Sequence, residues 1–211
     1  MGRGMSQIYL DWNLGLGDAI VCCGLVRELA KRNDRIILPC WARNERNVRH
    51  MFSDLRNIEV EVVATDRSGS RPGFRTVSIG MHASGFGELN WDQRFYAFAE
   101  VDFSRRWDSF DLPLGKSDIP VPSEPFALIC ERGSDGIYPL HGLNHPNPVR
   151  LERSPLLFDW VPMMREAEEI HCIDSAPMNL VESVPTKGKL FFHKYARGGV
   201  LNLRKSWVTL A

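Results

Sequence analysis

The chain lacks an apolar run long enough to cross a membrane. Among its 211 residues no stretch approaches the roughly 18 apolar residues of a membrane-spanning helix. The first residues, MGRGMSQ, also lack the apolar core of a signal peptide. We therefore expect a cytoplasmic protein that does not insert into a membrane.

Neither sign of charge is in excess. The 26 Lys and Arg residues balance the 26 Asp and Glu residues, so net charge gives no general attraction to nucleic acid, anionic lipid or acidic substrates. Any basic binding surface has to be local. Cysteine motifs are also lacking: the five cysteines, an odd number, form no C-x-x-C pair, and most lie in apolar segments. This usage predicts buried thiols in a reducing compartment.

Several cofactor motifs are incomplete. GLGDAI (15–20) has two glycines of a dinucleotide-binding G-x-G-x-x-G loop, but Ile20 replaces the third, and no acidic residue ends the next strand. FDLPLGKS (110–117) ends like a P-loop, yet Phe110 replaces its first glycine and no strand precedes it. There is no D-x-D pair and no His/Cys cluster with zinc spacing. The sequence predicts neither a dehydrogenase nor a P-loop NTPase, and it favours a mechanism without cofactor or metal.

What the chain does contain is a regular alternation of apolar strands and amphipathic helices. The first half reads strand, helix, strand, helix, strand, the order that builds a parallel sheet with right-handed crossovers. A fourth strand and an aromatic-rich segment, largely helical in its first half, follow. The predicted strands are 7–12, 35–41, 58–64 and 76–82; the predicted helices are 18–32, 44–55 and the first half of 90–110.

Residues 111–125 hold four prolines and no hydrophobic periodicity, and they separate this series from a second one. The second series has predicted strands at 126–130, 148–152, 170–173 and 189–195, and predicted helices at 157–169 and 176–184. We therefore predict an α/β protein of two tandem Rossmann-like domains with mainly parallel sheets, residues 1–115 and 116–211.

The sharpest local signal is AEEIHCIDSAPMNLVESV (167–184). A strand ends in Asp174 and Ser175, and a helix with Pro177 in its first turn begins at once. Backbone N–H groups at such a helix start, together with a hydroxyl, suit a diphosphate or the hydroxyls of a sugar. Capping of the helix by Ser175 or Asp174 explains the same residues about as well.

Two motifs together resemble the GT-B glycosyltransferases of the heptosyltransferase type: GLGDAI…GLVREL early in the chain and EEIHCIDSAPMNLVES late in it. A group of short phage and marine-bacterial proteins labelled glycosyltransferase is more similar still, because that likeness extends to WDQRFYAFAEVDFSRRWDSF and KLFFHKYAR. The chain is much shorter than a standard GT-B enzyme. The resemblance implies a compact GT-B-like fold, in which domain 1–115 serves the acceptor and domain 116–211 binds a nucleotide sugar.

By this resemblance, Asp18 matches the carboxylate that follows the glycine loop of Gly15 and Gly17 and acts as catalytic base. Such a base removes the proton of the acceptor hydroxyl as it attacks the anomeric carbon. Helix capping is the alternative role for Asp18, and because the helix dipole weakens the carboxylate as a base, both roles stay open. Asp174 and Ser175 match the donor-binding pair of an acidic residue and a hydroxyl.

Other candidates follow the strands. Arg132 and Ser134 lie in CERGSDG, after the first strand of the second domain, where a guanidinium suits the donor phosphates. Glu152 ends the next strand and is placed to accept from a ribose hydroxyl, although a solvated carboxylate fits better. His82 ends a strand of the first domain and is a candidate on the acceptor side. His193 and Lys194, at the end of the last predicted strand, and Arg197 after it could add positive charge near the cleft, although a plain solvated terminus fits better.

The sequence thus predicts a glycosyltransferase that moves a sugar from a nucleotide-sugar donor to an acceptor hydroxyl. The acceptor stays open among a glycan, a protein and a modified DNA base, and the oligomeric state is also open. Two other functions remain as alternatives. One is a non-catalytic GT-B-like module that binds a nucleotide or a glycan, and the other is a nucleotide-sugar epimerase of the GT-B class.

Overall fold

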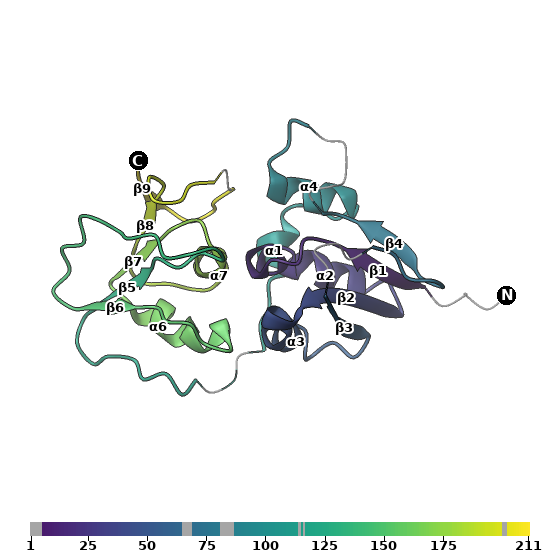
Figure 1. The fold of residues 1–211 in the computed structure, drawn as a ribbon, viewed down its shortest axis with the longest axis horizontal. Coiled ribbons are helices and arrows are strands. Elements are labelled where there is room, and N and C mark those ends of the chain that lie inside the picture. The colour runs from purple at the N-terminus through teal and green to yellow at the C-terminus, as the bar shows by residue number, and fades with distance from the viewer. Residues whose placement is uncertain (1–5, 65–68, 81–86, 114, 116, 200–201) are drawn as a thin grey trace. The chain divides into compact units, whose positions relative to one another are not determined.

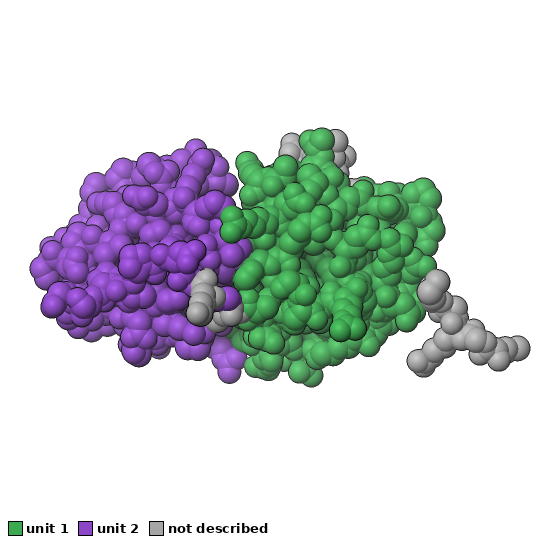
Figure 2. All heavy atoms as spheres, turned by 90° about the horizontal axis from the view of Figure 1, so that it is seen from below, with its two compact units in different colours: residues 1–113 green, residues 114–211 purple. Residues whose placement is uncertain are grey.

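The computed structural model describes residues 6–64, 69–80, 87–113, 115, 117–199 and 202–211. The chain divides within the proline-rich segment into two compact units, residues 1–113 and 114–211 (Figure 1 and Figure 2). Each unit contains its own parallel β-sheet. The predicted class, two Rossmann-like α/β domains, is confirmed. All five cysteines are buried free thiols, as their apolar surroundings predicted.

Unit 1 contains a four-stranded sheet of order β3-β2-β1-β4, in which every pairing is parallel. Successive side chains of a strand point to opposite faces, and residues 8–10 and 36–38 are all buried, so both faces of the sheet are covered. The elements are β1 (Gln7–Asp11), α1 (Leu16–Val21), α2 (Cys23–Ala30), β2 (Arg35–Trp41), η1 (Ala42–Asn44), α3 (Glu45–Met51), β3 (Ile58–Val63), β4 (Arg75–Ser78), α4 (Trp91–Phe98) and α5 (Arg105–Asp108).

The single helix predicted at 18–32 is wrong, because the segment forms two helices that meet at Cys22. The buried hydroxyl of Tyr96, from α4, donates to the Val21 carbonyl at 2.8 Å and accepts from the Leu25 N–H at 3.3 Å. Val21 and Leu25 are the pair that would bond directly in an unbroken helix. A side chain inserted into that ladder interrupts the helix.

The aromatic-rich segment 90–110, predicted to be helical in its first half, contains two helices. Asn90 and Gln93 form a capping box at the start of α4. Asp92 of α4 and Arg106 of α5 then form an ion pair whose two side chains are at most 1% exposed. This pair ties α5 to α4 within the core of unit 1.

Unit 2 contains a five-stranded parallel sheet of order β6-β5-β7-β8-β9. Pro162 lies in the first turn of a helix, where its missing N–H costs nothing. The elements are β5 (Ala127–Cys130), β6 (Pro148–Arg150), η2 (Leu157–Trp160), α6 (Val161–Glu166), β7 (Glu169–Cys172), α7 (Ala176–Ser183), β8 (Lys189–His193) and β9 (Trp207–Leu210).

Strand β9 was not predicted, since the sequence analysis ended the sheet at 189–195. Side chains on and near α7 fix its position. The Glu182 carboxylate accepts from the backbone N–H of Lys205 at 3.1 Å and from the Trp207 indole N–H at 2.7 Å. The Lys205 ammonium donates to the Val181 carbonyl at 2.6 Å and to the Val184 carbonyl. Such contacts between distant segments leave no periodic signal in a four-residue strand.

Candidate functional site

The strand order reverses next to the first strand of each sheet. The reversal lies between β1 and β4 in unit 1 and between β5 and β7 in unit 2 (Figure 1). Open α/β sheets bind their ligands outside the carboxyl ends of the strands at such a point. Most residues that the sequence analysis selected lie in the loops that follow β1, β5 and β7.

In unit 1, two hydrogen bonds fix the glycine loop that follows β1. The Trp12 indole N–H donates to the Pro39 carbonyl at 2.7 Å, and the Asn44 amide donates to the Leu14 carbonyl at 2.8 Å. Both partners belong to β2 or to the segment after it. The loop that carries Gly15 and Gly17 is therefore anchored at the carboxyl edge of the sheet.

Asp18 is the third residue of α1, and Gly15 is the residue that precedes this helix. A Cβ atom added to Gly15 would lie 2.8 Å from Oδ2 of Asp18, so the half-buried carboxylate is turned back over the helix start. The N-cap position belongs to Gly15, so Asp18 acts on the helix start only from within the first turn, and its carboxylate still lies at the ligand edge. The catalytic and the capping roles of Asp18 both remain predictions.

A second carboxylate at this edge escaped the sequence analysis. Asp11 ends β1 and is paired in register with Ser78 of β4, whose hydroxyl donates to Oδ2 of Asp11. Asp11 is buried, at 7% exposure. Its signal in the sequence is a charged residue that closes an apolar strand. His82, the acceptor-side candidate, lies outside the described residues.

In unit 2, the loop after β5 is a tight hairpin. Arg132 and Ile137 form an antiparallel bridge, the Gly133 N–H donates to the Gly136 carbonyl at 2.8 Å, and the Tyr138 N–H donates to the Glu131 carbonyl at 2.8 Å. The predicted donor residue Ser134 lies at the exposed turn of this hairpin. Arg132 lies in its stem, half-buried.

The turn after β7 places Asp174 and Ser175 directly before α7. The Ser175 hydroxyl donates backwards to the Ile173 carbonyl at 3.1 Å and makes no capping bond to the helix. Burial raises the pKa of Asp174, and the positive charge of Arg197 opposes that rise. In the described part of the chain, no hydrogen bond reaches the Asp174 carboxylate. Ser175 thus gives the first turn of α7 no side-chain cap, and the neighbouring Asp174 carboxylate accepts no hydrogen bond from a described residue.

Arg197, which ranked low in the sequence analysis, lies at the same edge. The Asp174 N–H donates to the Arg197 carbonyl at 3.1 Å. The Arg197 guanidinium lies 5.5 Å from the centroid of the Tyr138 ring and 3.7 Å from the Asp135 carboxylate. The segment after β8 is therefore joined to both loops at the reversal point, a contact that residue spacing does not reveal.

His193 is also placed differently from the solvated terminus that was predicted. It is fully buried, and its Nε2 lies 2.8 Å from Nδ1 of His171 on the neighbouring strand. His193 Nδ1 lies 3.0 Å from the Tyr195 hydroxyl, and His171 Nε2 lies 3.2 Å from the Glu169 carboxylate. These four side chains form a hydrogen-bonded chain along β7 and β8. Lys194 is exposed, as predicted.

Glu152, the remaining donor candidate, is exposed two residues beyond β6, the edge strand of the sheet. No described residue forms a hydrogen bond or ion pair with its side chain. Because β6 pairs in parallel with β5, Glu152 follows a strand that ends at the same carboxyl edge, and its role in donor binding stays a prediction.

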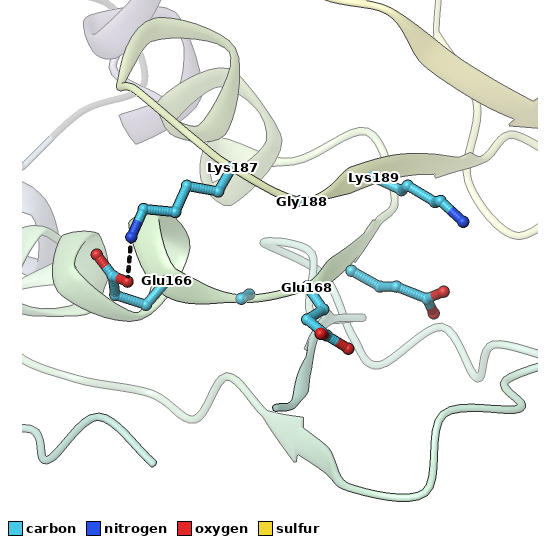
Figure 3. A pocket seen from close by; sticks show the side chains of 7 residues that line it. Glu166, Glu168, Lys187, Gly188 and Lys189 are labelled. Atoms are coloured by element: carbon cyan, nitrogen blue, oxygen red, sulfur yellow. Dashed lines mark hydrogen bonds and ion pairs between the residues drawn. The ribbon is translucent and has the colours of Figure 1, made fainter. Parts of the chain in front are cut away.

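A hollow of about 430 Å³ lies at the opposite, amino edge of the unit 2 sheet (Figure 3). It is lined by residues 166–169 and 187–189, and the Lys187 ammonium lies 2.6 Å from the Glu166 carboxylate across it. Apart from Gly188, the labelled residues carry charged side chains. Because α/β sheets bind ligands at their carboxyl edge, we do not assign the donor to this hollow.

No family model matches the chain, and no curated protein matches it in sequence. Solved structures match the chain in fold. One is the iron-containing dodecameric glycosyltransferase TibC from enterotoxigenic E. coli H10407, with a TM-score of 0.61 at 11% identity over 97% of this chain and 64% of that one. Another is the dodecameric heptosyltransferase TibC in complex with ADP-D-β-D-heptose, with a TM-score of 0.61 at 13% identity over 90% of this chain and 58% of that one. This chain spans less than two thirds of either and shares the fold of a glycosyltransferase.

TibC contains iron, but within the ranges that the structure describes here, no group of three or more His, Cys, Asp or Glu side chains is arranged to hold a metal ion. The described residues therefore offer no donor set for iron. None of the helices in these ranges combines the length and the apolar character that crossing a membrane requires.

Proposed function

We propose that the chain is a metal-independent glycosyltransferase that moves a sugar from a nucleotide-sugar donor to an acceptor hydroxyl. The observation that carries the proposal is the turn between β7 and α7. There the start of α7 has no cap from Ser175, and the half-buried Asp174 carboxylate has no described hydrogen-bond partner. A helix start favours phosphate oxygens, and a carboxylate accepts from sugar hydroxyls.

In the proposed reaction, unit 2 binds the donor. Asp174 and Ser175 contact the sugar and the diphosphate, and the hairpin with Arg132 and Ser134 lies at the same edge. Asp18 of unit 1 takes the proton of the acceptor hydroxyl as its oxygen bonds to the anomeric carbon. The bond from that carbon to the nucleoside diphosphate breaks, and the diphosphate leaves with the bonding electrons. Stabilisation of this leaving charge by fixed donors supplies much of the rate.

Two observations support a nucleotide sugar as ligand. The fold is shared with TibC, which binds ADP-D-β-D-heptose, and the candidate residues of unit 2 gather at the reversal point of its sheet. The acceptor class follows from neither, and a glycan, a protein and a modified DNA base are all compatible with a hydroxyl nucleophile.

The alternative is a GT-B-like module that binds a nucleotide or a glycan without transfer. The observation that favours it is length, because the chain spans only 64% and 58% of the two TibC chains. Such a module would keep the donor site of unit 2 and would not depend on Asp18 as a base.

A panel of ADP-, UDP-, GDP- and CMP-linked sugars separates the two functions. Thermal stabilisation by one donor, followed by its slow hydrolysis and by transfer to an added acceptor, is expected of the enzyme. Stabilisation without hydrolysis or transfer indicates the binding module. A panel without any stabilisation at millimolar concentrations contradicts the enzyme and the nucleotide-binding form of the module.

A further inference from the structure

We infer that Arg197 is the principal side chain that binds the diphosphate of the nucleotide, and that Asp135 competes with the diphosphate for it. The inference rests on the proposed function and deepens its donor site. It assigns the phosphate-binding cation to the segment after β8, whereas the sequence placed that cation at Arg132.

The backbone and the side chain of Arg197 contact different loops. Its carbonyl accepts the Asp174 N–H at 3.1 Å, which fixes its main chain beside the turn before α7. Its side chain crosses to the hairpin after β5, where a Cβ atom on Gly133 would lie 2.4 Å from Nη1 of Arg197. Only a glycine lets the guanidinium lie this close to the hairpin backbone. The cation is thus held at the point where the strand order of the sheet reverses.

No described residue accepts a hydrogen bond from the N–H groups of this guanidinium. The Nη1 atom lies 3.7 Å from Oδ1 of Asp135, beyond hydrogen-bond distance, and no hydrogen bond from the side chain to another described residue is formed. The Tyr138 ring supports the guanidinium face at 5.5 Å without using an N–H group. Five N–H donors in a planar fork are therefore available to two phosphate oxygens.

Asp135 is a weak competitor. Its carboxylate accepts the Tyr138 hydroxyl at 2.7 Å, and this bond, more than the charge of Arg197, holds the pKa of Asp135 below its usual range. Its side chain is 56% exposed, and exposed ion pairs contribute little stability. A diphosphate with bidentate, charge-assisted bonds displaces such a partner. Arg132 has no comparable tie, because within the described residues its main chain pairs with Ile137 and makes no hydrogen bond to the turn before α7.

Titration calorimetry with ADP, UDP, GDP and inorganic pyrophosphate tests the assignment. Arg197→Ala is expected to raise the Kd of the best-bound nucleoside diphosphate about 10- to 100-fold, the worth of a charge-assisted bond. Asp135→Asn keeps an acceptor for Tyr138 and removes the competing charge, so it should lower the Kd about two- to fivefold. Lys187→Ala is the control. It removes one positive charge at the amino edge of the sheet and should leave the Kd within about twofold.

The outcomes separate this inference from the proposed function. If wild type binds a nucleoside diphosphate and Arg197→Ala binds it equally well, the inference is overturned while the donor site at Asp174 stands. If Arg132→Ala costs more than Arg197→Ala, the cation is Arg132 and the inference is also overturned. If no probe binds the folded wild type, the donor site itself fails. Should Arg197→Ala melt early, the tighter binding expected of Asp135→Asn still decides the question.

Discussion

The Nδ1 atom of His171 lies 2.8 Å from the Nε2 atom of His193, and both rings are buried. These rings belong to a hydrogen-bonded series with Glu169 and Tyr195. With both histidines neutral, one arrangement of the hydrogens gives every group in the series a partner. Tyr195 O–H donates to His193, His193 donates to His171, and His171 donates to the Glu169 carboxylate. A neutral histidine has one donor and one acceptor, so protonation of both rings sets two N–H donors against each other, and a proton on either ring alone places a charge in the buried pair.

The buried histidine pair predicts a loss of stability in mild acid. Burial lowers the pKa of His193 to about 4, with the adjacent His171 and His141 adding to the effect, while an unfolded histidine titrates near 6.5. Between these values the unfolded state binds more protons, so stability is complete above pH 6.5 and falls as pH drops toward 4. Burial also lowers the pKa of His171, against the opposing effect of Glu169.

The comparison that isolates this effect is His193→Gln, which keeps hydrogen-bonding groups and does not titrate. Urea unfolding at pH 7.5 and pH 4.5 gives the change in the free energy of unfolding for each protein. The carboxylates contribute equally to this change in wild type and variant, so the difference between the two proteins reports the histidine. The wild type should lose about 3 kcal/mol more than the variant over this range. Parallel pH profiles of the two proteins would contradict the neutral pair.

Tyr96→Phe is predicted to destabilise unit 1 by about 1–3 kcal/mol, the cost of leaving a buried polar group without its partner. The lost hydroxyl joins the Val21 carbonyl to the Leu25 N–H. Chemical denaturation gives the free energy, and hydrogen exchange of the Leu25 amide gives the local effect. Unchanged stability with a protected Leu25 amide would mean that α1 and α2 merge into one helix without the hydroxyl.

The fold was predictable because apolar periodicity and strand–helix alternation are local properties. β2 was predicted at 35–41, where the structure has it, and the other predicted strands overlap observed ones. The features that were predicted wrongly or missed depend on contacts between distant segments. The break at Cys22 needs Tyr96, and β9 needs Glu182, which is 25 residues from Trp207.

The candidate site was predictable only in part. Loops after parallel strands gather at one edge, so Asp174 and the 131–138 hairpin could be placed together from the sequence. The sequence does not show whether Arg132 or Arg197 contacts these residues. Both arginines follow strands, and they differ only in the path of their side chains. Asp11 was missed because its partner, Ser78, lies 67 residues away.

The buried pair of Asp92 and Arg106 predicts an asymmetric response to mutation. Asp92→Ala leaves the Arg106 guanidinium, 1% exposed, without its carboxylate, and should cost about 3–5 kcal/mol. Lys31→Ala breaks the exposed pair with Glu28, 2.6 Å apart, and should cost at most about 1 kcal/mol. Thermal melts of both variants test this. Equal losses would indicate that the buried charge finds another partner or water.

The last prediction concerns Asp18, whose carboxylate is turned back over the start of α1 toward Gly15. If Asp18 is the catalytic base, Asp18→Asn should fold nearly normally, because asparagine has the same shape and the loss of a first-turn carboxylate costs at most about 1 kcal/mol. Single-turnover transfer should fall about 10²- to 10⁴-fold, the usual worth of a positioned base. Donor binding should change little, since the proposed donor site lies in unit 2.

If Asp18 only caps the helix, the pattern reverses. Asp18→Asn should then keep full turnover, while Asp18→Ala should lose about 0.3–1 kcal/mol of stability, the usual worth of a carboxylate in the first turn of a helix. Gly15→Ala provides an independent check, because the added methyl would lie 2.8 Å from the Asp18 carboxylate and force it to move. A base that must meet an acceptor loses rate when it is displaced, even when the protein melts normally. Wild-type turnover in both Asp18→Asn and Gly15→Ala would remove Asp18 from the mechanism and leave the glycine loop with a structural role alone.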